Sequence, residues 1–181
     1  MTLDPVPASG QPGASARPPR AHWLLFIGLA AGIVVIDQLT KAAITANLQP
    51  GEVVAVLEDL LRITFSQNNG AIFGLFQDQA LLFALISIGV LGLIVWFEGH
   101  AGSSLIVSIA LGLLLGGAIG NLIDRLRFGY VIDWVDMGIG DWRFYTYNIA
   151  DAAISTALVL LIVGAILPLG RPAVASRAGD A

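Results

Sequence analysis

The chain has 181 residues, of which 56% are hydrophobic and only 12% are charged, and its net charge is −4. Soluble domains carry about 25% charged residues, so this composition predicts a membrane protein, and the absence of a basic stripe argues against a nucleic-acid partner. The chain has no cysteine, which excludes disulfides, thiolate metal sites and a thiol nucleophile.

A disordered N-terminal extension precedes the first apolar run. Residues 1–20 are rich in Pro, Gly, Ala and Ser, a composition that cannot bury a core. The run that follows predicts a membrane helix over residues 22–40. A cleaved signal peptide is the alternative, because basic residues also precede its apolar segment. We favour the uncleaved helix, since the run ends in DQLTK and not in a small-residue cleavage site.

Asp37 and Lys41 close this first run and lie four residues apart, on one face of a helix. A surface ion pair that ends the helix is one interpretation. An acid inside an apolar run is costly, however, and marks a functional site or a buried pair. We therefore expect Asp37 to pair with Lys41, whose long stem can carry its ammonium to the membrane interface.

The region 42–78 is too polar to span a membrane. Pro50 and Gly51 predict a turn, and residues 62–65 alternate as a strand does. Turn formers then gather in SQNNGAIFG, residues 66–74. These patterns predict a small β-rich cap with an interfacial segment that lies on the membrane.

Two further apolar runs predict membrane helices over residues 79–98 and 103–123, joined by a tight turn in EGHAG. Gly112, Gly116 and Gly120 recur every four residues in the second of these runs, a pattern that lets membrane helices approach closely. A nucleotide-binding glycine loop is a poor alternative, because no strand precedes these glycines. The glycines are expected to pack helices.

The last apolar run predicts a fourth membrane helix over residues 147–168, followed by a flexible tail over residues 171–181. We expect residues 21–170 to form one membrane domain. Four helices place both termini on the same side, but the counts of basic residues do not settle which side that is. Most basic residues on the other side lie within polar clusters, and on that ground we favour cytoplasmic termini.

Polar residues gather at the face of the bundle opposite the termini. The clusters are Asp37 with Lys41, Asn68 to Gly70, Asn121 to Asp136, and Asn148 with Asp151. Solvated loop residues would not lie inside apolar runs, so this one-sided clustering indicates a functional site.

The end of the third run supplies Asn121, Asp124 and Arg125 at spacings that share one helix face. We interpret them as a helix-ending network in which Asp124 and Arg125 bind backbone or each other, and in which Arg125 orients the following loop. Asp133 lies between Tyr-Val-Ile and Trp-Val, an apolar setting that an exposed loop does not need. Asp136, which precedes loop residues, is expected to be solvated.

Asn148 and Asp151 lie three residues apart at the start of the fourth run, with Ser155 one turn further along. An acid at a helix N-terminus also complements the helix dipole, so a structural role is an alternative. Asp151 is expected to lie beyond the usual cap position, in an alanine-rich turn. We therefore expect it to meet Asp133.

Two carboxylates close together in a low-dielectric environment cannot both ionise easily, so the pair shares one proton. One acid can then act as a base for water while the other protonates a carbonyl or a leaving amine. Other hydrolytic designs fit less well, because His22 and His100 lie at the opposite face and neither GxSxG nor HExxH occurs. Metal binding by the acids alone stays open at this point.

Four motifs together give the sequence a close resemblance to the bacterial lipoprotein signal peptidases, also called type II signal peptidases. In chain order they are DQLTK (37–41), NNGAIF (68–73), GGAIGNLIDR with GYVIDW (116–134) and YNIADAAI (147–154). Each motif alone is weak, whereas all four on four predicted membrane helices are specific. The Pro-rich N-terminal extension departs from the compact family pattern, and we assign it no role.

The resemblance implies an all-α membrane protein with four transmembrane helices and a small β-rich extracytoplasmic cap with an interfacial segment. It implies an intramembrane aspartic endopeptidase that removes the signal peptide of prolipoproteins by cleaving before their diacylglyceryl-modified cysteine. The family's catalytic aspartates match Asp133 and Asp151. Its surrounding polar residues match Asp37, Lys41, Asn68, Gly70, Asn121, Asp124, Arg125 and Asn148.

The resemblance further implies a multi-pass protein of the bacterial cytoplasmic (inner) membrane, with cytoplasmic termini and the active site toward the outer face. We expect a monomer that needs no metal or cofactor. The lipid tails of the substrate are expected to enter between helices, against the small residues of 116–120. Asn68 and the loop over residues 66–74 are expected to hydrogen-bond the substrate backbone.

Two functions from other classes compete with a peptidase. One is a non-enzymatic tetraspan assembly protein, whose acids merely pair between helices. The other is a proton-coupled transporter, for which intramembrane acids are also typical. Without an inverted repeat or broken midplane helices, the transporter is disfavoured.

Overall fold

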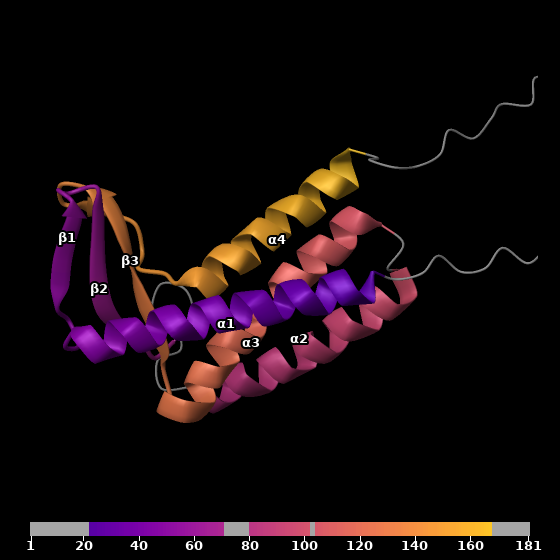
Figure 1. Ribbon diagram of the computed structural model, residues 1–181, viewed down its shortest axis with the longest axis horizontal. Helices are drawn as coiled ribbons and strands as arrows, with labels where there is room; N and C mark the ends of the chain where they lie inside the picture. The colour runs from indigo at the N-terminus through magenta and orange to yellow at the C-terminus, as the bar shows by residue number, and fades with distance from the viewer. Residues whose placement is uncertain (1–21, 71–79, 102–103, 168–181) are drawn as a thin grey trace, which may run out of the picture.

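The computed structural model describes residues 22–70, 80–101 and 104–167. Within these residues the chain forms four helices with a sheet at one end of them (Figure 1). In chain order the elements are α1 (Trp23–Asn47), β1 (Val53–Leu57), β2 (Leu61–Asn68), α2 (Ala80–Ala101), α3 (Leu105–Phe128), β3 (Val131–Ile139), β4 (Trp142–Arg143) and α4 (Ile149–Ile166). The predicted N-terminal extension, the C-terminal tail and the part of the interfacial segment after Gly70 lie outside the described residues.

Helix α3 is the centre of the bundle, because α1, α2 and α4 all pack against it. Its glycines allow the close approach, as the sequence predicts. A Cβ on Gly116 would lie 2.8 Å from the backbone oxygen of Ala30 in α1. A Cβ on Gly117 would lie 2.5 Å from the backbone oxygen of Ala150 in α4. Two adjacent glycines thus serve two different helix contacts.

The expectation that lipid tails pack against residues 116–120 stays a prediction, although the glycines of this stretch face neighbouring helices. Gly116, Gly117 and Gly120 are all buried. Helices α1 and α4 occupy the space beside them. Ala118 in the same stretch is half-buried and lines a cavity between α2, α3 and α4.

Among the described residues, three helices are long and apolar enough to cross a membrane, namely α1, α3 and α4. Helix α2 is apolar over a shorter stretch, Leu85–Gly99. Helix α1 continues past its predicted end, so Asp37 and Lys41 lie within it and do not end it. The sequence predicts a turn over residues 98–102. This prediction is wrong for residues 98–101, because α2 continues to Ala101. Helix α1 begins, and α4 ends, at the end of the bundle away from the sheet (Figure 1).

The cap is an antiparallel sheet in the order β1-β2-β3-β4. The sequence predicts the cap in residues 42–78 alone, whereas β3 and β4 come from the connection between α3 and α4. That connection turns at Gly129, whose φ of 80° lies in the left-handed region that glycine adopts without a Cβ clash. Strand β3 follows and pairs with β2, so that Asp133 is opposite Ser66.

Candidate active site

Asp133 lies on β3 with its carboxylate buried and held by two asparagines. Asn68, on the neighbouring strand β2, donates its Nδ2 to Asp133 Oδ2 at 2.9 Å, and Asn148 donates its Nδ2 to Asp133 Oδ1 at 2.7 Å. The apolar setting indicated by the sequence is present, since Asp133 is only 2% exposed. Burial, followed by the nearby charge of Asp151, raises the pKa of Asp133 to about 7. The two asparagine hydrogen bonds and the charge of Lys41 act in the opposite direction on this pKa.

Asp151 is the third residue of α4 and forms a capping box with Asn148. Its backbone N–H donates to Asn148 Oδ1 at 3.0 Å, and its Oδ2 accepts from the Asn148 backbone N–H at 3.3 Å. Asp151 therefore caps α4, as the structural alternative expects, and the expectation that it lies beyond the usual cap position is wrong. Its other oxygen, Oδ1, accepts a hydrogen bond from Asn121 Nδ2 at 2.7 Å. One carboxylate thus begins α4 and also faces α3.

Two asparagine side chains connect Asp133 to Asp151. Asn148 Nδ2 donates to Asp133 and also to Asn121 Oδ1, the latter at 3.1 Å. Asn121 Nδ2 in turn donates to Asp151. Amides supply donors to a carboxylate without adding a compensating charge. We call Asp133 and Asp151 the acid pair, because this network joins their two carboxylates through neutral amides.

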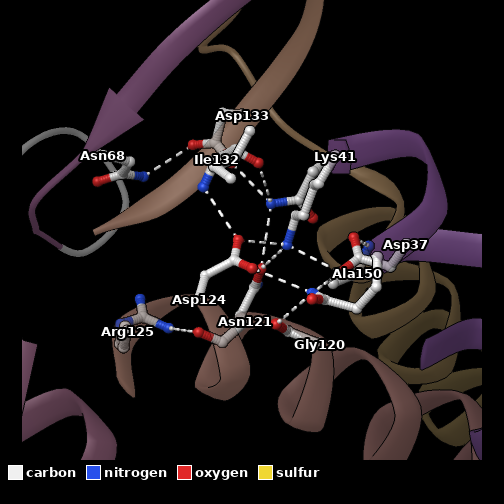
Figure 2. A network of polar contacts seen from close by, with 12 residues as sticks. Asp37, Lys41, Asn68, Gly120, Asn121, Asp124, Arg125, Ile132, Asp133 and Ala150 are labelled. Carbon is white, nitrogen blue, oxygen red and sulfur yellow. Dashed lines mark hydrogen bonds and ion pairs between the residues drawn. The ribbon is translucent and has the colours of Figure 1, made fainter. Parts of the chain in front are cut away.

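A second cluster, formed by Asp37, Lys41 and Asp124 and here called the lysine cluster, lies beside Asp133 (Figure 2). The Lys41 ammonium contacts Asp37 Oδ2 and Asp124 Oδ2, each at 2.8 Å, and donates to Asn121 Oδ1 at 3.0 Å. The predicted pairing of Asp37 with Lys41 is confirmed. The predicted route of Lys41 to the membrane interface is wrong, because its side chain is only 2% exposed.

The carboxylates of the lysine cluster also fix the backbone of neighbouring elements (Figure 2). Asp37 Oδ1 accepts the backbone N–H of Ala150 in α4 at 3.1 Å, and Asp124 Oδ2 accepts that of Ile132 in β3 at 3.0 Å. A Cβ on Gly120 would lie 2.6 Å from Asp37 Oδ2, so the glycine makes room for the buried carboxylate. The lysine cluster therefore fixes the two elements that carry the acid pair.

The remaining predicted site residues lie at the edges of these networks. Gly70 donates its backbone N–H to Asn68 Oδ1 at 3.1 Å, which leaves the Asn68 amide nitrogen directed toward Asp133. Arg125 donates to the backbone oxygen of Asn121 at 3.3 Å, within α3. All ten predicted residues thus lie in or next to one connected region.

Asp136 differs from its prediction. It was expected to be solvated, but its side chain is only 14% exposed and pairs with Arg143 at 2.9 Å. Arg143 also donates to the backbone oxygen of Asp59. The physical reason is the unpredicted pairing of β3 with β2 and β4, which places Asp136 inside the sheet instead of in a loop.

Two cavities open beside the acid pair, and Asp151 lines both. One, of about 470 Å³, lies between the sheet and α4, where Trp142 and Tyr147 contribute aromatic walls. The other, of about 270 Å³, lies between α2, α3 and α4 and includes Asn121 and Arg125. A peptide that occupied either cavity would reach Asp151.

Gln38 and Tyr145 belong to this region although the sequence reasoning does not single them out. Gln38 Nε2 donates to Asp124 Oδ1 at 3.0 Å and to the Gly120 backbone oxygen at 3.2 Å. Its position inside DQLTK is the signal that could have found it. Tyr145 lines both cavities, but it lies in a connection rich in aromatic residues and no spacing marks it.

The acid pair can hold and exchange a proton beside a space large enough for a peptide. An Asp133 with a pKa of about 7 holds its proton for much of the time at neutral pH. Within the part of the chain that the structure describes, no group of three or more acidic or histidine side chains is placed to hold a metal ion. The chemistry that these side chains themselves supply is general acid–base catalysis.

Sequence comparison identifies the family. Residues 29–167 match the family described as Signal peptidase (SPase) II. The chain is 37% identical to the lipoprotein signal peptidase of Geobacillus thermodenitrificans over 141 residues, which cover 77% of this chain and 88% of that protein. It is 40% identical to the lipoprotein signal peptidase of Coxiella burnetii over 156 residues, which cover 83% of this chain and 93% of that protein.

Structural comparison agrees with the sequence. A solved structure described as a bacterial membrane enzyme has a TM-score of 0.76 and 32% identity, and the match covers 82% of this chain and 91% of that one. A second, with the same description, has a TM-score of 0.75 and 33% identity, over 84% of this chain and 98% of that one. The resemblance seen in the four motifs is confirmed, and the chain belongs to the signal peptidase II family of membrane enzymes.

Proposed function

We propose that this chain removes the signal peptide from prolipoproteins by cleaving before the diacylglyceryl-modified cysteine, and that Asp133 and Asp151 activate the attacking water. Family membership supports the reaction and the substrate class. The observation that supports the residue assignment is the acid pair itself. Its two carboxylates come from β3 and α4, are connected through Asn148 and Asn121, and lie beside two cavities.

The acid pair carries one proton near neutral pH, because a second ionisation would place two negative charges close together away from water. The ionised aspartate accepts a proton from water as the water oxygen attacks the scissile carbonyl carbon. The protonated aspartate donates its proton to the carbonyl oxygen. When the tetrahedral intermediate collapses, one of its hydroxyls returns a proton to the aspartate that is now ionised, the C–N bond breaks, and the leaving amine takes the proton held by the other aspartate.

The polar residues around the acid pair act as positioning residues in this proposal. Lys41 binds Asn121 Oδ1, which directs the Asn121 amide nitrogen to Asp151. Asp37 and Asp124 hold Lys41 in place. On the other side, Asn68 holds Asp133 through its amide nitrogen, and we expect it to hydrogen-bond the substrate backbone.

Arg125, Gly70 and Asn148 complete the proposed set. Arg125 lines the smaller cavity, where its guanidinium would face a bound peptide. Gly70 orients Asn68 through its backbone N–H. Asn148 contacts both members of the acid pair, so it fixes their relative position.

In the proposed membrane arrangement, α2 crosses the bilayer together with α1, α3 and α4. It has 22 residues, and at 1.5 Å per residue a helix of that length spans about 33 Å, close to the roughly 30 Å of a hydrocarbon core. Residues 21–170 then form a single four-helix peptidase domain, which works as a monomer and without a metal or cofactor.

The proposed location is the bacterial inner membrane, with both termini in the cytoplasm. The start of α1 and the end of α4 lie away from the sheet, which supports placing the termini together on one side (Figure 1). The acid pair lies at the sheet end of the helices, and this end would face the outer side of the membrane. Prolipoproteins and membrane lipid are then the only partners that the proposal requires.

The test is cleavage of a synthetic diacylglyceryl-modified precursor by purified protein in detergent or lipid, without added metal. The natural chain should release the signal peptide, and Asp151→Asn should lower the rate by about 10²- to 10⁴-fold, the usual contribution of a general acid or base. Asp141→Asn is the matched control, because Asp141 is an exposed acid in the turn before β4. It should cleave at the natural rate.

The outcome also separates the rival functions. A folded natural chain that does not cleave the precursor would support an assembly protein or a transporter. Full cleavage by Asp151→Asn, with unchanged folding, would remove the acid pair from the mechanism while leaving the family reaction in place.

A further inference from the structure

Among the described residues, Tyr145 is the one large side chain that both cavities beside the acid pair share. The two linings have Tyr145, Asp151 and Ser155 in common. Aspartate and serine are too short to separate cavities of about 470 and 270 Å³. We therefore take the phenol ring of Tyr145, the largest side chain in contact with both, as the wall between them.

Neighbouring rings hold this wall in place. The Tyr145 ring packs against Phe144, with centroids 4.3 Å apart, and against Tyr147, with centroids 6.3 Å apart. Such aromatic contacts add stability beyond burial alone. The side chain is half-buried, so the ring is part of the packed structure and not a freely moving surface group.

The two cavities that the ring separates differ in their chemistry. The larger has aromatic walls from the connection before α4 and from β4, such as Tyr147 and Trp142. The smaller includes Ser87, Asn121 and Arg125, which can hydrogen-bond a peptide backbone. A substrate that passes Asp151 would meet an apolar environment on one side and a more polar one on the other.

The phenol also lies within electrostatic range of the acid pair. Burial, followed by the charges of Asp151 and Asp133, raises the pKa of Tyr145 above its usual value. The phenol therefore stays neutral under conditions where the acid pair works. It can border the reacting groups without adding a third negative charge.

We propose that Tyr145 is a substrate-positioning residue, whose ring separates the parts of the substrate on either side of the scissile bond and holds that bond against Asp151. The inference rests on the proposed peptidase function, and it adds Tyr145 as a residue that determines how the substrate is positioned. Without the ring the two cavities would join, and the chain would bind in several positions, most of them unproductive. The effective affinity for the substrate would fall, whereas the rate of the chemical step would stay the same.

The test compares Tyr145→Ala, Tyr145→Phe and the natural chain in steady-state cleavage of two lipidated precursors. The precursors differ only in the size of the residue before the scissile bond. Tyr145→Ala should raise KM about tenfold for the small-residue precursor, change kcat by less than about threefold, and reduce the discrimination between the two precursors. Tyr145→Phe keeps the ring and should behave like the natural chain.

A second variant and a control keep the test decisive. Tyr145→Trp enlarges the wall and should sharpen the discrimination, whether or not Tyr145→Ala folds. Phe128→Ala removes an aromatic ring at the end of α3 that lines neither cavity, and should leave the discrimination unchanged. Binding of uncleaved precursor to Asp151→Asn, with and without Tyr145→Ala, measures the same loss of affinity without catalysis.

Three results would overturn the inference. Unchanged KM and discrimination in Tyr145→Ala would show that the ring positions nothing. A fall in kcat with a lower thermal midpoint and unchanged discrimination would show a purely structural role. A loss in Tyr145→Phe as large as in Tyr145→Ala would assign the effect to the hydroxyl and not to the wall. Failure of the proposed function differs from all three, because the natural chain would then cleave neither precursor.

Discussion

The acid pair and the lysine cluster each contain two aspartates, and Asn121 contacts both. The groups that bind their carboxylates, however, differ in charge. In the lysine cluster, the Lys41 ammonium binds Asp37 and Asp124 at 2.8 Å. In the acid pair, the side-chain donors to Asp133 and Asp151 are neutral amides. The buried carboxylates thus bind a cation directly in the lysine cluster and neutral amides in the acid pair.

This difference gives the four aspartates of one small region two different chemical environments. Asp37 and Asp124 bind the Lys41 ammonium and also accept backbone N–H groups of α4 and β3. A buried carboxylate with only amide partners has a raised pKa, as Asp133 does, and can exchange protons. The groups that bind each carboxylate, more than the carboxylate itself, therefore distinguish the lysine cluster from the acid pair.

Lys41→Met should have the largest effect on stability. It would leave Asp37 and Asp124 buried without their cation, and breaking a buried pair in this way costs about 3–5 kcal/mol. We expect a large fall in the thermal midpoint in detergent, together with loss of activity. Arg127→Met, which removes an exposed cation from the end of α3, should change the midpoint little. Equal midpoints for the two variants would contradict the compensating role of Lys41.

Asp133→Asn should lose activity but, unlike Lys41→Met, keep the stability of its fold. Removing a general acid or base lowers the rate by about 10²- to 10⁴-fold, while asparagine fits the same space without a charge. Cleavage assays and thermal unfolding of the same preparation would measure both effects. A large loss of stability in this variant would mean that the acid pair, like the lysine cluster, holds the fold together.

The pH dependence of unfolding gives an independent measure of the same residue. The pKa of Asp133 rises from 3.8 to about 7 on folding, so between these values the native state binds a proton that the unfolded state has released. The contribution of Asp133 to the free energy of unfolding is therefore full below about pH 4 and is lost as the pH rises to about 7. Asp133→Asn should remove this part of the pH dependence.

Gly117→Ala should lower stability less than Lys41→Met does, and it tests how closely the clusters depend on helix packing. The added methyl would lie 2.5 Å from the backbone oxygen of Ala150, so α4 must shift. Overpacking of this kind costs about 1–3 kcal/mol. Gly32→Ala is the matched control, because no atom lies within 4 Å of a Cβ at that position. Equal stability of the two variants would refute the proposed close contact of α3 with α4.

Much of this arrangement could be predicted from the sequence because its signals are local. Asp37 and Lys41 are four residues apart on one helix, so their pairing follows from helical periodicity. The four-residue spacing of glycines in α3 likewise predicts close packing against other helices. The apolar neighbours of Asp133 indicate its burial without any knowledge of its partners.

The features that could not be predicted depend on contacts between distant segments. Strand β3 lies in a connection after α3, and its pairing with β2 joins residues about seventy positions apart. This pairing is why Asp136 is enclosed and why Asn68 reaches Asp133. The burial of Lys41 also depends on Asp124, a partner on another helix that no local spacing reveals.

The capping box of α4 has a consequence for the biosynthesis of the protein. Asn148 and Asp151 form the first turn of that helix, and the ribosome makes them after α1, α2 and α3. A nascent chain that ends before this turn lacks one member of the acid pair and the amide that bridges to the other. Proteolytic competence would therefore arise only when the fourth helix has joined the bundle, so partly synthesised chains in the membrane would be inert toward their neighbours.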